Sequence, residues 1–375
     1  MVRIGVLTSS RADFGVYEPL LNSLREDSDI ELGIIAFGTH LSRQHGFTLD
    51  EILLKKFQTK YTIPSLLADD SEEAISTSYA LTSLKFSTFW AEHGSKFDIV
   101  FCMGDRFEMF AAVIAGVPFG IKFAHFYGGD YTLGAIDNVF RDCMTHCSIL
   151  HFTSTNKCAE RVKMLTGSDK GISAVGILSL AGSSTLDLLS AKEFQYRWKI
   201  DLSVPTILMT IHPDTIETKK NYTDAKIIFN VTEKLQEHYQ IVITMPNADT
   251  NGSIYRNMFK KLADNESDKI YLVENFGIQS YFSCMKYSKL VIGNTSSGIT
   301  ESATFNKYFV NIGNRQKGRE TGENVISVPF DEKSILTEVH RVLKKGEFHG
   351  KNIYYQKNSL KKIIKIVKES FNGKY

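Results

Sequence analysis

The chain has 375 residues, of which 43% are hydrophobic, 23% charged and 11% aromatic. This composition excludes disordered and fibrous architectures, and the length corresponds to about two domains. The 44 basic and 42 acidic residues leave a formal net charge of +2. Because proteins that wrap nucleic acid usually carry a larger basic excess, we expect no nucleic-acid partner.

The cysteines and the apolar runs predict a cytoplasmic protein. The five cysteines are odd in number and lie mostly within apolar runs, which does not suit a disulfide scaffold. The N-terminal apolar run, residues 4–7, is too short for a secretory signal. The longest uncharged apolar stretch, residues 109–121, falls short of the ~20 residues that a membrane span needs. We therefore expect no membrane partner.

Short β-branched runs alternate with longer amphipathic stretches in both halves of the chain. The strands expected in the first half are residues 3–7, 32–37, 98–103, 120–126 and 149–153. Helical stretches lie between them at residues 15–25, 71–93 and 106–115. The second half repeats the alternation with strands at residues 206–211, 240–245, 269–273, 290–293 and 308–312. The pattern predicts an α/β protein with two Rossmann-like domains, each a parallel sheet covered by helices.

We place the boundary between the two domains near Ser179. Gly182, Ser183 and Ser184 interrupt the apolar pattern within residues 176–201. The N-terminal domain then comprises residues 1–178 and the C-terminal domain residues 179–355.

The chain ends in an amphipathic helix, expected over residues 359–372. One face carries apolar residues at helical spacing, namely Leu360, Ile363, Ile364, Val367 and Phe371. Four lysines fall elsewhere, and Ser359 is the candidate N-cap. The alternatives are a membrane-surface helix and a docked helix. We expect a docked helix, and the first domain is one surface on which it can pack.

Ligands of open parallel sheets bind beyond the carboxyl ends of the strands, so the residues directly after each strand of the first half are candidates. Residues 8–11, Thr-Ser-Ser-Arg, form a polar turn into a helix, where backbone N–H groups and Arg11 suit a phosphate. Asp105 comes after the third strand and is either an N-cap or a catalytic group. Asp130 comes after the next strand, and Asp137 lies on a probable helix beyond it. Capping alone does not explain so many ionisable groups at one edge.

Two segments of the second half carry candidate binding residues. His212 comes directly after the strand 206–211, at the carboxyl edge of the sheet. Residues 293–301, GNTSSGITE, come after an apolar strand and lead into a helix. Gly298 allows close backbone approach, and Ser296 and Ser297 with the helix-start N–H groups suit a diphosphate. Glu301 is placed to accept hydrogen bonds from a ribose.

A group of possible metal ligands lies at Cys143, His146, Cys147 and His151. These residues divide between a helix and a buried strand, which makes a shared coordination geometry doubtful. We interpret the cysteines as small core residues and expect no metal and no cofactor.

Seven segments together resemble the hydrolysing UDP-N-acetylglucosamine 2-epimerases that supply sialic-acid and related nonulosonate synthesis. They are SRADFG (10–15), GDRFE (104–108), GAIDN (134–138), HP (212–213), PNADT (246–250), GNTSSGITE (293–301) and NIGNRQKGR (311–319). The likeness covers nearly the whole chain. It implies two Rossmann-like domains of glycosyltransferase-B type with a cleft between them, and a homodimer or homotetramer.

The resemblance also implies the reaction and the site. The expected substrate is a nucleotide sugar, UDP-N-acetylglucosamine, which is converted with water to N-acetylmannosamine and UDP through a glycal. Alternatives are the same chemistry on a UDP- or GDP-linked 2,4-diacetamido-2,4,6-trideoxyglucose of legionaminic-acid synthesis, and a glycosyltransferase of the same fold. The implied nucleotide-binding residues are Arg11, Ser296, Ser297, Gly298 and Glu301. The implied catalytic residues are Asp105, Tyr127, Asp130, Asp137 and His212.

The chain departs from many relatives at three positions. Tyr127 and Asp130 stand where glutamates are common, and Asp142 stands where a histidine is common after an arginine. A phenol has an unperturbed pKa of about 10, which makes it a poor base at neutral pH. We interpret Tyr127 as part of a variant sugar subsite, with its side chain reaching the sugar.

Overall fold

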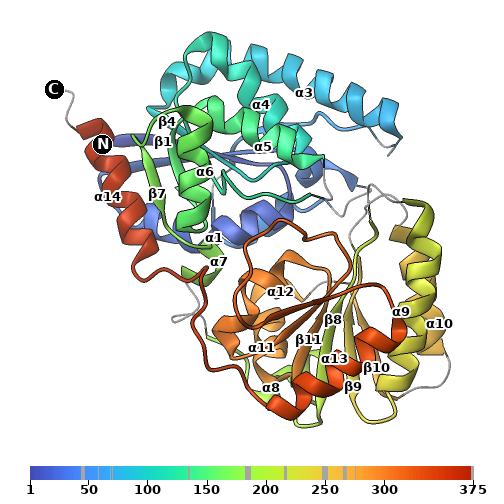
Figure 1. The fold of residues 1–375 in the computed structure, drawn as a ribbon. Coiled ribbons are helices and arrows are strands. Elements are labelled where there is room, and N and C mark those ends of the chain that lie inside the picture. Colours follow the sequence, from blue (N-terminus) through green and yellow to red (C-terminus); the bar gives the residue numbers. More distant parts are fainter. Residues whose placement is uncertain are drawn as a thin grey trace. The chain divides into compact units, whose positions relative to one another are not determined.

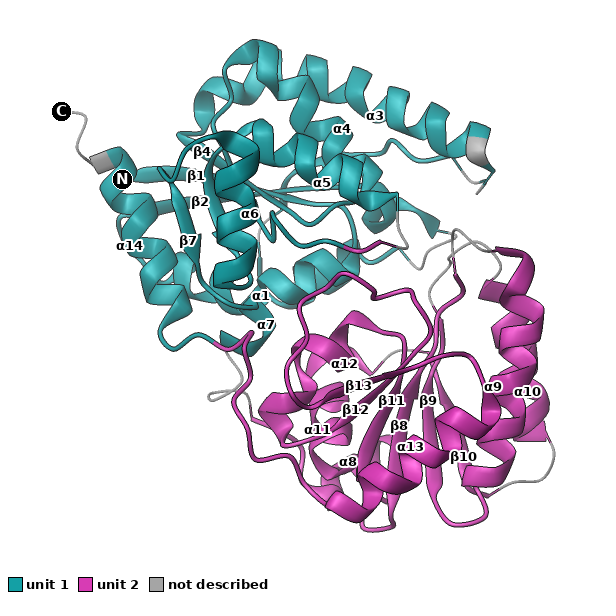
Figure 2. Cartoon of the chain, viewed as in Figure 1, with its two compact units in different colours: residues 1–131, 136–182, 356–375 teal, residues 132–135, 183–355 magenta. Residues whose placement is uncertain are grey.

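The computed structural model describes residues 1–43, 47–57, 59–67, 69, 71–133, 136–181, 187–214, 218–246, 252–264, 268–274 and 276–372. The chain divides into two compact units (Figure 2). Unit 1 comprises residues 1–131, 136–182 and 356–375, and unit 2 comprises residues 132–135 and 183–355. Gly182, Ser183 and Ser184, which the sequence suggests as the join, lie outside the described residues.

Unit 1 is built on a seven-stranded parallel sheet with the order β3-β2-β1-β4-β5-β6-β7 (Figure 1). Its strands are β1 (Val2–Thr8), β2 (Ile30–Phe37), β3 (Thr59–Ile63), β4 (Ile99–Met103), β5 (Phe123–Phe126), β6 (Ser148–Thr153) and β7 (Ile172–Ala174). Its helices are α1 (Arg11–Arg25), α2 (Leu49–Leu54), α3 (Glu72–His93), α4 (Phe107–Gly116), α5 (Asp137–His146), α6 (Asn156–Thr166), α7 (Leu178–Ala181) and α14 (Ser359–Asn372).

Two apolar clusters cover the two faces of this sheet. Along β4, Phe101 and Met103 belong to the cluster that includes α1 and α14, whereas Val100 and Cys102 belong to the cluster that includes α3 and α4. This alternation follows from the period of two in a strand. Since both faces are buried, β4 is a continuous apolar run, which is why the sequence predicts it well.

The C-terminal helix α14 packs within unit 1. Ile363 and Val367 are fully buried in the cluster shared with α1. The Ser359 hydroxyl donates to the Val175 carbonyl at 2.5 Å and to the Gln356 carbonyl at 2.7 Å. Ser359 is the first residue of the helix, so the suggestion that it is the N-cap is wrong. Lys368 forms ion pairs with Asp27 and Asp29.

Unit 2 is built on a six-stranded parallel sheet with the order β10-β9-β8-β11-β12-β13. Its strands are β8 (Thr206–Thr210), β9 (Gln240–Thr244), β10 (Ile270–Val273), β11 (Leu290–Gly293), β12 (Phe309–Ile312) and β13 (Val325–Val328). Its helices are α8 (Ala191–Trp198), α9 (Asn221–Leu235), α10 (Gly252–Asp264), α11 (Gly277–Tyr287), α12 (Ser296–Thr300) and α13 (Glu332–Lys345). Helices α9, α10 and α13 share one apolar cluster with the sheet.

The expected fold class, two Rossmann-like α/β sheets, is confirmed. Three strands were not expected, β3, β7 and β13, and each lies at an end of its sheet. Their residues are only partly buried over most of their length, so they form no apolar run in the sequence. The pattern of hydrophobic residues therefore identifies the inner strands and the edge strand β10, and it misses the three edge strands whose sequences carry too few buried apolar residues.

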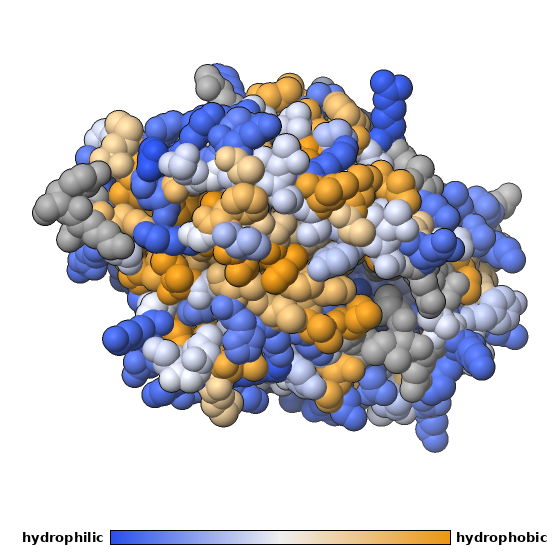
Figure 3. Space-filling view, turned by 90° about the horizontal axis from the view of Figure 1, so that it is seen from above, coloured by the Kyte–Doolittle hydropathy of each residue, from blue (hydrophilic) through white to orange (hydrophobic). Residues whose placement is uncertain are grey.

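Some apolar side chains remain exposed on unit 1, among them Leu84 on α3 and Val139 on α5. On the face seen in Figure 3, hydrophobic and hydrophilic residues are interspersed. No helix within the described ranges has the length and apolar character to cross a membrane.

Candidate active site

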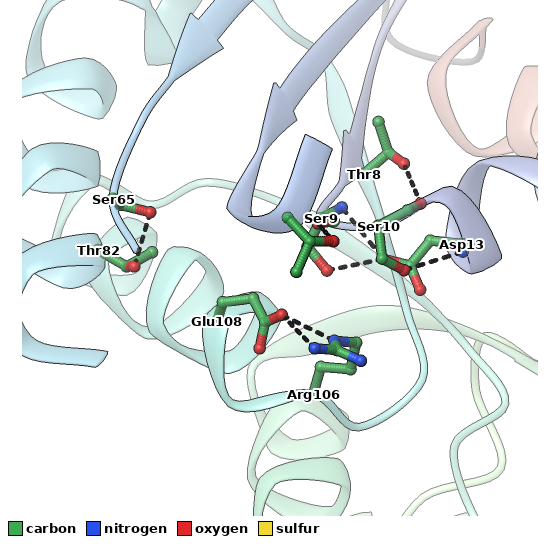
Figure 4. Close-up of polar contacts among 9 residues, drawn as sticks. Thr8, Ser9, Ser10, Asp13, Ser65, Thr82, Arg106 and Glu108 are labelled. Carbon is green, nitrogen blue, oxygen red and sulfur yellow. Dashed lines mark hydrogen bonds and ion pairs between the residues drawn. The ribbon is translucent and has the colours of Figure 1, made fainter. Parts of the chain in front are cut away.

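The turn after β1 is fixed by hydrogen bonds at the start of α1 (Figure 4). Ser10 is the N-cap and accepts a hydrogen bond from the Asp13 amide at 3.3 Å. The Ser9 amide and hydroxyl donate to Asp13 Oδ2 at 3.0 and 2.7 Å. Arg11 is the first residue of the helix, with 44% of its side chain exposed and one nitrogen 3.8 Å from Glu51. This turn presents a cation at a helix N-terminus, as an anion site requires.

Arg141 links the Asp105 carboxylate to the backbone of Asp130. Its Nη2 forms an ion pair with Asp105, which comes after β4. Its Nη1 donates to the Asp130 carbonyl at 2.9 Å and to Asn138 Oδ1 at 2.8 Å. Only 2% of the Arg141 side chain is exposed, whereas 31% of Asp105 is exposed. The N-cap position of α4 belongs to Arg106, so Asp105 is not the N-cap of this helix. Asp105 and Asp130 thus belong to one network at the carboxyl ends of β4 and β5.

The Asp130 carboxylate is buried against the start of α6. Its Oδ1 accepts hydrogen bonds from the Ser154 hydroxyl at 2.8 Å and from the Cys158 thiol at 3.1 Å. Burial and the nearby charge of Asp130 raise the pKa of Cys158 to about 12, so the thiol keeps its proton. A buried carboxylate needs such donors, because water cannot stabilise its charge.

Two neighbours of Asp105 were not among the predicted site residues, although both lie in the GDRFE motif. Arg106 Nε donates to Glu108 Oε1 at 2.7 Å, and the Glu108 side chain is fully buried (Figure 4). The negative charge of Glu108 raises the pKa of Arg106. Nearly half of the Arg106 side chain remains exposed. The pair therefore fixes a second cation near the carboxyl end of β4.

His125 holds the backbone that carries Asp105. Its Nε2 lies 2.9 Å from the Gly104 carbonyl and its Nδ1 lies 3.1 Å from the Thr145 hydroxyl. Burial lowers the pKa of His125 to about 4, so the ring is neutral near pH 7. A neutral imidazole has one N–H, and the carbonyl assigns it to Nε2.

Tyr127 is directed into unit 1. Its φ is +69°, an uncommon conformation for a bulky side chain, and it packs against the apolar cluster around α1. Its hydroxyl accepts a hydrogen bond from the Leu178 amide at 2.8 Å. The phenol therefore stabilises the start of α7, and a role in the sugar subsite has no support from these contacts.

Asp137 is the first residue of α5 and is partly buried. Two residues before it in the GAIDN motif, Gly134 and Ala135, lie outside the described residues, as do residues 247–250 of the PNADT motif.

His151, one of the four possible metal ligands, is buried, which lowers its pKa to about 4. Over the described part of the chain, no three histidine, cysteine or acidic side chains gather as a metal site.

The loop after β8 is clamped to the loop after β11 in unit 2. Asn294 Oδ1 accepts from the His212 amide at 2.7 Å, and Asn294 Nδ2 donates to the His212 carbonyl at 2.8 Å. Gln316 Nε2 donates to the Asn294 carbonyl at 3.0 Å. This double hydrogen bond fixes His212 at the carboxyl edge of the sheet. Sequence patterns do not reveal Asn294 as its partner, because 82 residues separate them.

The predicted nucleotide segment forms the short helix α12. Ser297 donates to the Glu301 carboxylate, and Thr295 caps the helix by accepting from the Ser297 amide at 3.4 Å. Ser296 is exposed. A Cβ on Gly298 would lie 2.3 Å from the Phe309 ring, so this glycine allows α12 to pack on β12.

Tyr281 on α11 is a further residue that sequence reasoning missed. Its hydroxyl is buried, and the Ser297 and Thr210 hydroxyls and the Glu301 carboxylate surround it. Burial, reinforced by the Glu301 charge, raises the pKa of Tyr281, so the phenol stays neutral. Hydroxyl groups thus lie together with one carboxylate, that of Glu301, beside α12.

Comparison with known proteins gives three findings. A family model described as UDP-N-acetylglucosamine 2-epimerase matches residues 22–368. A Campylobacter jejuni protein named GDP/UDP-N,N'-diacetylbacillosamine 2-epimerase (hydrolyzing) is 32% identical over 346 residues, covering 92% of this chain and 88% of that protein. A Legionella pneumophila protein named UDP-N,N'-diacetylbacillosamine 2-epimerase (hydrolyzing) is 28% identical, covering 98% and 95%.

A solved structure also shares the fold. The crystal structure of UDP-GlcNAc 2-epimerase from Neisseria meningitidis bound to UDP-GlcNAc superposes with a TM-score of 0.80 at 16% identity, covering 98% of this chain and 100% of that one. The fold and the family matches agree with the resemblance found in the sequence motifs, which is confirmed.

Proposed function

Because the chain belongs to the UDP-N-acetylglucosamine 2-epimerase family, we propose that it is a hydrolysing nucleotide-sugar 2-epimerase. In this reaction the bond from C1 to the nucleotide diphosphate breaks and the proton at C2 leaves, which gives a glycal. Water then adds its oxygen to C1, and a proton adds to C2 from the opposite face. The products are a nucleoside diphosphate and a free sugar with inverted C2, a precursor of the nonulosonate type.

The proposed substrate is a UDP- or GDP-linked 2,4-diacetamido-2,4,6-trideoxyglucose. The names of the relatives at 32% and 28% identity support this choice, because both specify diacetylbacillosamine. UDP-N-acetylglucosamine, the first expectation from the sequence, is the second candidate. The family description and the Neisseria structure with its bound UDP-GlcNAc favour it.

The chemistry requires cations at the diphosphate and carboxylates around the sugar ring. The C2 proton is not acidified by a carbonyl, so departure of the nucleotide must lead and leave positive character at C1. We assign proton transfer to Asp105, Asp130 and Asp137. The observation that carries this assignment is the buried Arg141, which ties Asp105 to the backbone of Asp130. Two carboxyl groups in one network, one partly exposed and one buried, suit the transfer of protons to and from a substrate.

Nucleotide binding is assigned to unit 2 and to the turn after β1. Ser296, Ser297 and Glu301 are proposed to bind the nucleoside diphosphate, with Arg11 as a cation for the phosphates. His212, whose backbone is clamped by Asn294, is proposed to stabilise the departing diphosphate. Gly298 takes part through packing rather than direct contact, since its absent Cβ is what admits the Phe309 ring. Tyr127 has no catalytic step in this proposal.

Nucleotide release tests the function directly. Purified protein is incubated with the UDP-diacetamido sugar, the GDP-diacetamido sugar and UDP-N-acetylglucosamine in separate reactions without any acceptor. We expect release of the nucleoside diphosphate from a diacetamido sugar, and Asp105→Asn is the matched inactive control. Turnover that needs a sugar acceptor would instead indicate a glycosyltransferase. In heavy water the free sugar should carry one deuterium at C2, and a product without it would contradict elimination and addition.

A further inference from the structure

The side chain of Asp130 sits in a set of buried polar contacts that the reaction does not by itself require. Ser154, directly after β6, is fully buried, and Cys158 in the first turn of α6 is 5% exposed. Both bond to the same oxygen, Oδ1, at 2.8 and 3.1 Å. A carboxylate that meets two donors on one oxygen has its rotation restricted as well as its charge stabilised.

The direction of these hydrogen bonds follows from the protonation of each group. The Cys158 thiol, whose pKa is raised to about 12 by burial, is protonated and donates its S–H. The Ser154 hydroxyl lies 3.3 Å from the same sulfur, but it has one proton, and the charged oxygen of Asp130 is the stronger acceptor. Both protons are therefore directed at one oxygen of the Asp130 carboxylate.

The turn before Asp130 is held against the same helix. Gly129 has φ +82°, and a Cβ at this position would lie 2.2 Å from the Cys158 carbonyl oxygen. The turn can approach α6 this closely only because residue 129 is glycine. Thr155 caps α6 by accepting from the Cys158 amide at 3.2 Å, so the first turn that carries the thiol is itself ordered.

The backbone of Asp130 is also connected to the carboxylate of Asp105 through Arg141. Its carbonyl accepts from Arg141, and the same guanidinium pairs with Asp105. Two ionisable side chains bond to Asp130 itself, Arg141 on α5 to its carbonyl and Cys158 on α6 to its carboxylate.

We propose that Ser154 and Cys158 are positioning residues, which hold the Asp130 carboxylate in a fixed orientation for proton transfer at the sugar. This inference rests on the 2-epimerase activity proposed above. It assigns no substrate contact to the thiol or the hydroxyl. They act through Asp130 and, by way of Arg141, on the placement of Asp105.

The separate effects on kcat and KM test this role with the variants Ser154→Ala, Cys158→Ala and Cys158→Ser. Loss of a donor leaves the carboxylate free to rotate away from the sugar, so kcat should fall about tenfold in each alanine variant, whether Asp130 acts as base or as acid. KM should change little, since no substrate contact is lost. Cys158→Ser keeps a donor and should restore kcat to a value close to that of the wild type.

Cys284→Ala is the matched control, because Cys284 is a buried thiol in unit 2, whereas the proposed proton-transfer carboxylates belong to unit 1. Its kcat and KM should stay close to those of the wild type. Thermal unfolding of each variant separates loss of folding from loss of position, and Ser154→Ala and Cys158→Ser keep the test informative if Cys158→Ala does not fold. An active wild type whose kcat is unchanged in both Ser154→Ala and Cys158→Ala would overturn the positioning role. A wild type that releases no nucleotide would instead reject the proposed function.

Discussion

The loops after β4 and β5 in unit 1 and the loops after β8 and β11 in unit 2 are held by different kinds of side chains. In unit 1 these loops hold buried or half-buried charges, in which Arg141 pairs with Asp105 and Arg106 pairs with Glu108. In unit 2 they are held by the Asn294 amide and by hydroxyls near Tyr281, with the Glu301 carboxylate among them. Paired charges are suited to moving protons, and hydroxyls on a tightly packed turn are suited to binding.

This difference has an energetic consequence. Removing one member of a buried ion pair leaves an uncompensated charge. A substitution in a close-packed neutral turn instead changes the packing, and with it the shape of the surface that binds the ligand. Variants of the charged loops after β4 and β5 should therefore alter kcat, and variants of the turn at α12 should alter nucleotide affinity.

The largest effect is expected for Asp105→Asn. The amide keeps the size of the side chain but cannot transfer a proton or neutralise Arg141, so turnover should fall at least ~100-fold. Nucleotide affinity, measured by calorimetry with UDP and GDP, should change little. Activity near that of the wild type in a folded variant would move Asp137 to first place among the carboxylates and would weaken the contrast between the units.

Gly298→Ala should disturb the packing of α12 on β12 in unit 2. The new methyl group would meet the Phe309 ring, and overpacking of this kind costs about 1–3 kcal/mol in the free energy of unfolding. Nucleotide affinity should fall with it, because Ser297 and Glu301 lie on the same turn. Gly15→Ala within α1 is the matched control. Nothing lies within 4 Å of a Cβ added at Gly15, so this variant should gain up to ~1 kcal/mol in the free energy of unfolding. Equal stability of the two variants would argue against close packing at Gly298.

Stability should depend on pH through His125. Its pKa is about 4 in the folded protein and about 6.5 when unfolded, so the folded state binds fewer protons between these values. This contribution is complete above pH 6.5 and is lost as the pH falls toward 4, by about 2 kcal/mol at pH 5. Urea unfolding at pH 7 and pH 5 should show a smaller difference for His125→Gln than for the wild type. His340→Gln, on an exposed position of α13, should keep the full difference.

The smallest effect is expected for Tyr127→Phe. Loss of the phenol leaves the Leu178 amide without its acceptor and should cost about 1 kcal/mol in unfolding free energy. Turnover should stay within about tenfold of the wild type, since proton transfer is assigned to the carboxylates. Measured kcat and KM decide between a structural and a catalytic role of the phenol. A loss of ~100-fold in kcat with KM unchanged would make Tyr127 catalytic.

The sequence alone predicted the parts of this protein that depend on local pattern. Inner strands such as β4 and β11 are continuous apolar runs because both of their faces are buried, and the residues after them mark the carboxyl edge. Hence Asp105, Asp130 and the segment from Ser296 to Glu301 were identified as candidates. The edge strands β3, β7 and β13 were missed, since partial burial removes their apolar signal.

Only the tertiary structure decided which side chains meet. Arg141 joins Asp105 although 36 residues separate them, and Asn294 clamps His212 across 82 residues. The direction of Tyr127 also depended on context, because its positive φ turns the ring toward the core and its hydroxyl toward Leu178. Hydrophobic periodicity reports how each residue faces its own sheet, but hydrogen bonds between distant loops depend on the packing of all the strands. The sequence therefore determined where candidate groups stand, and the packed sheets determined how they are paired.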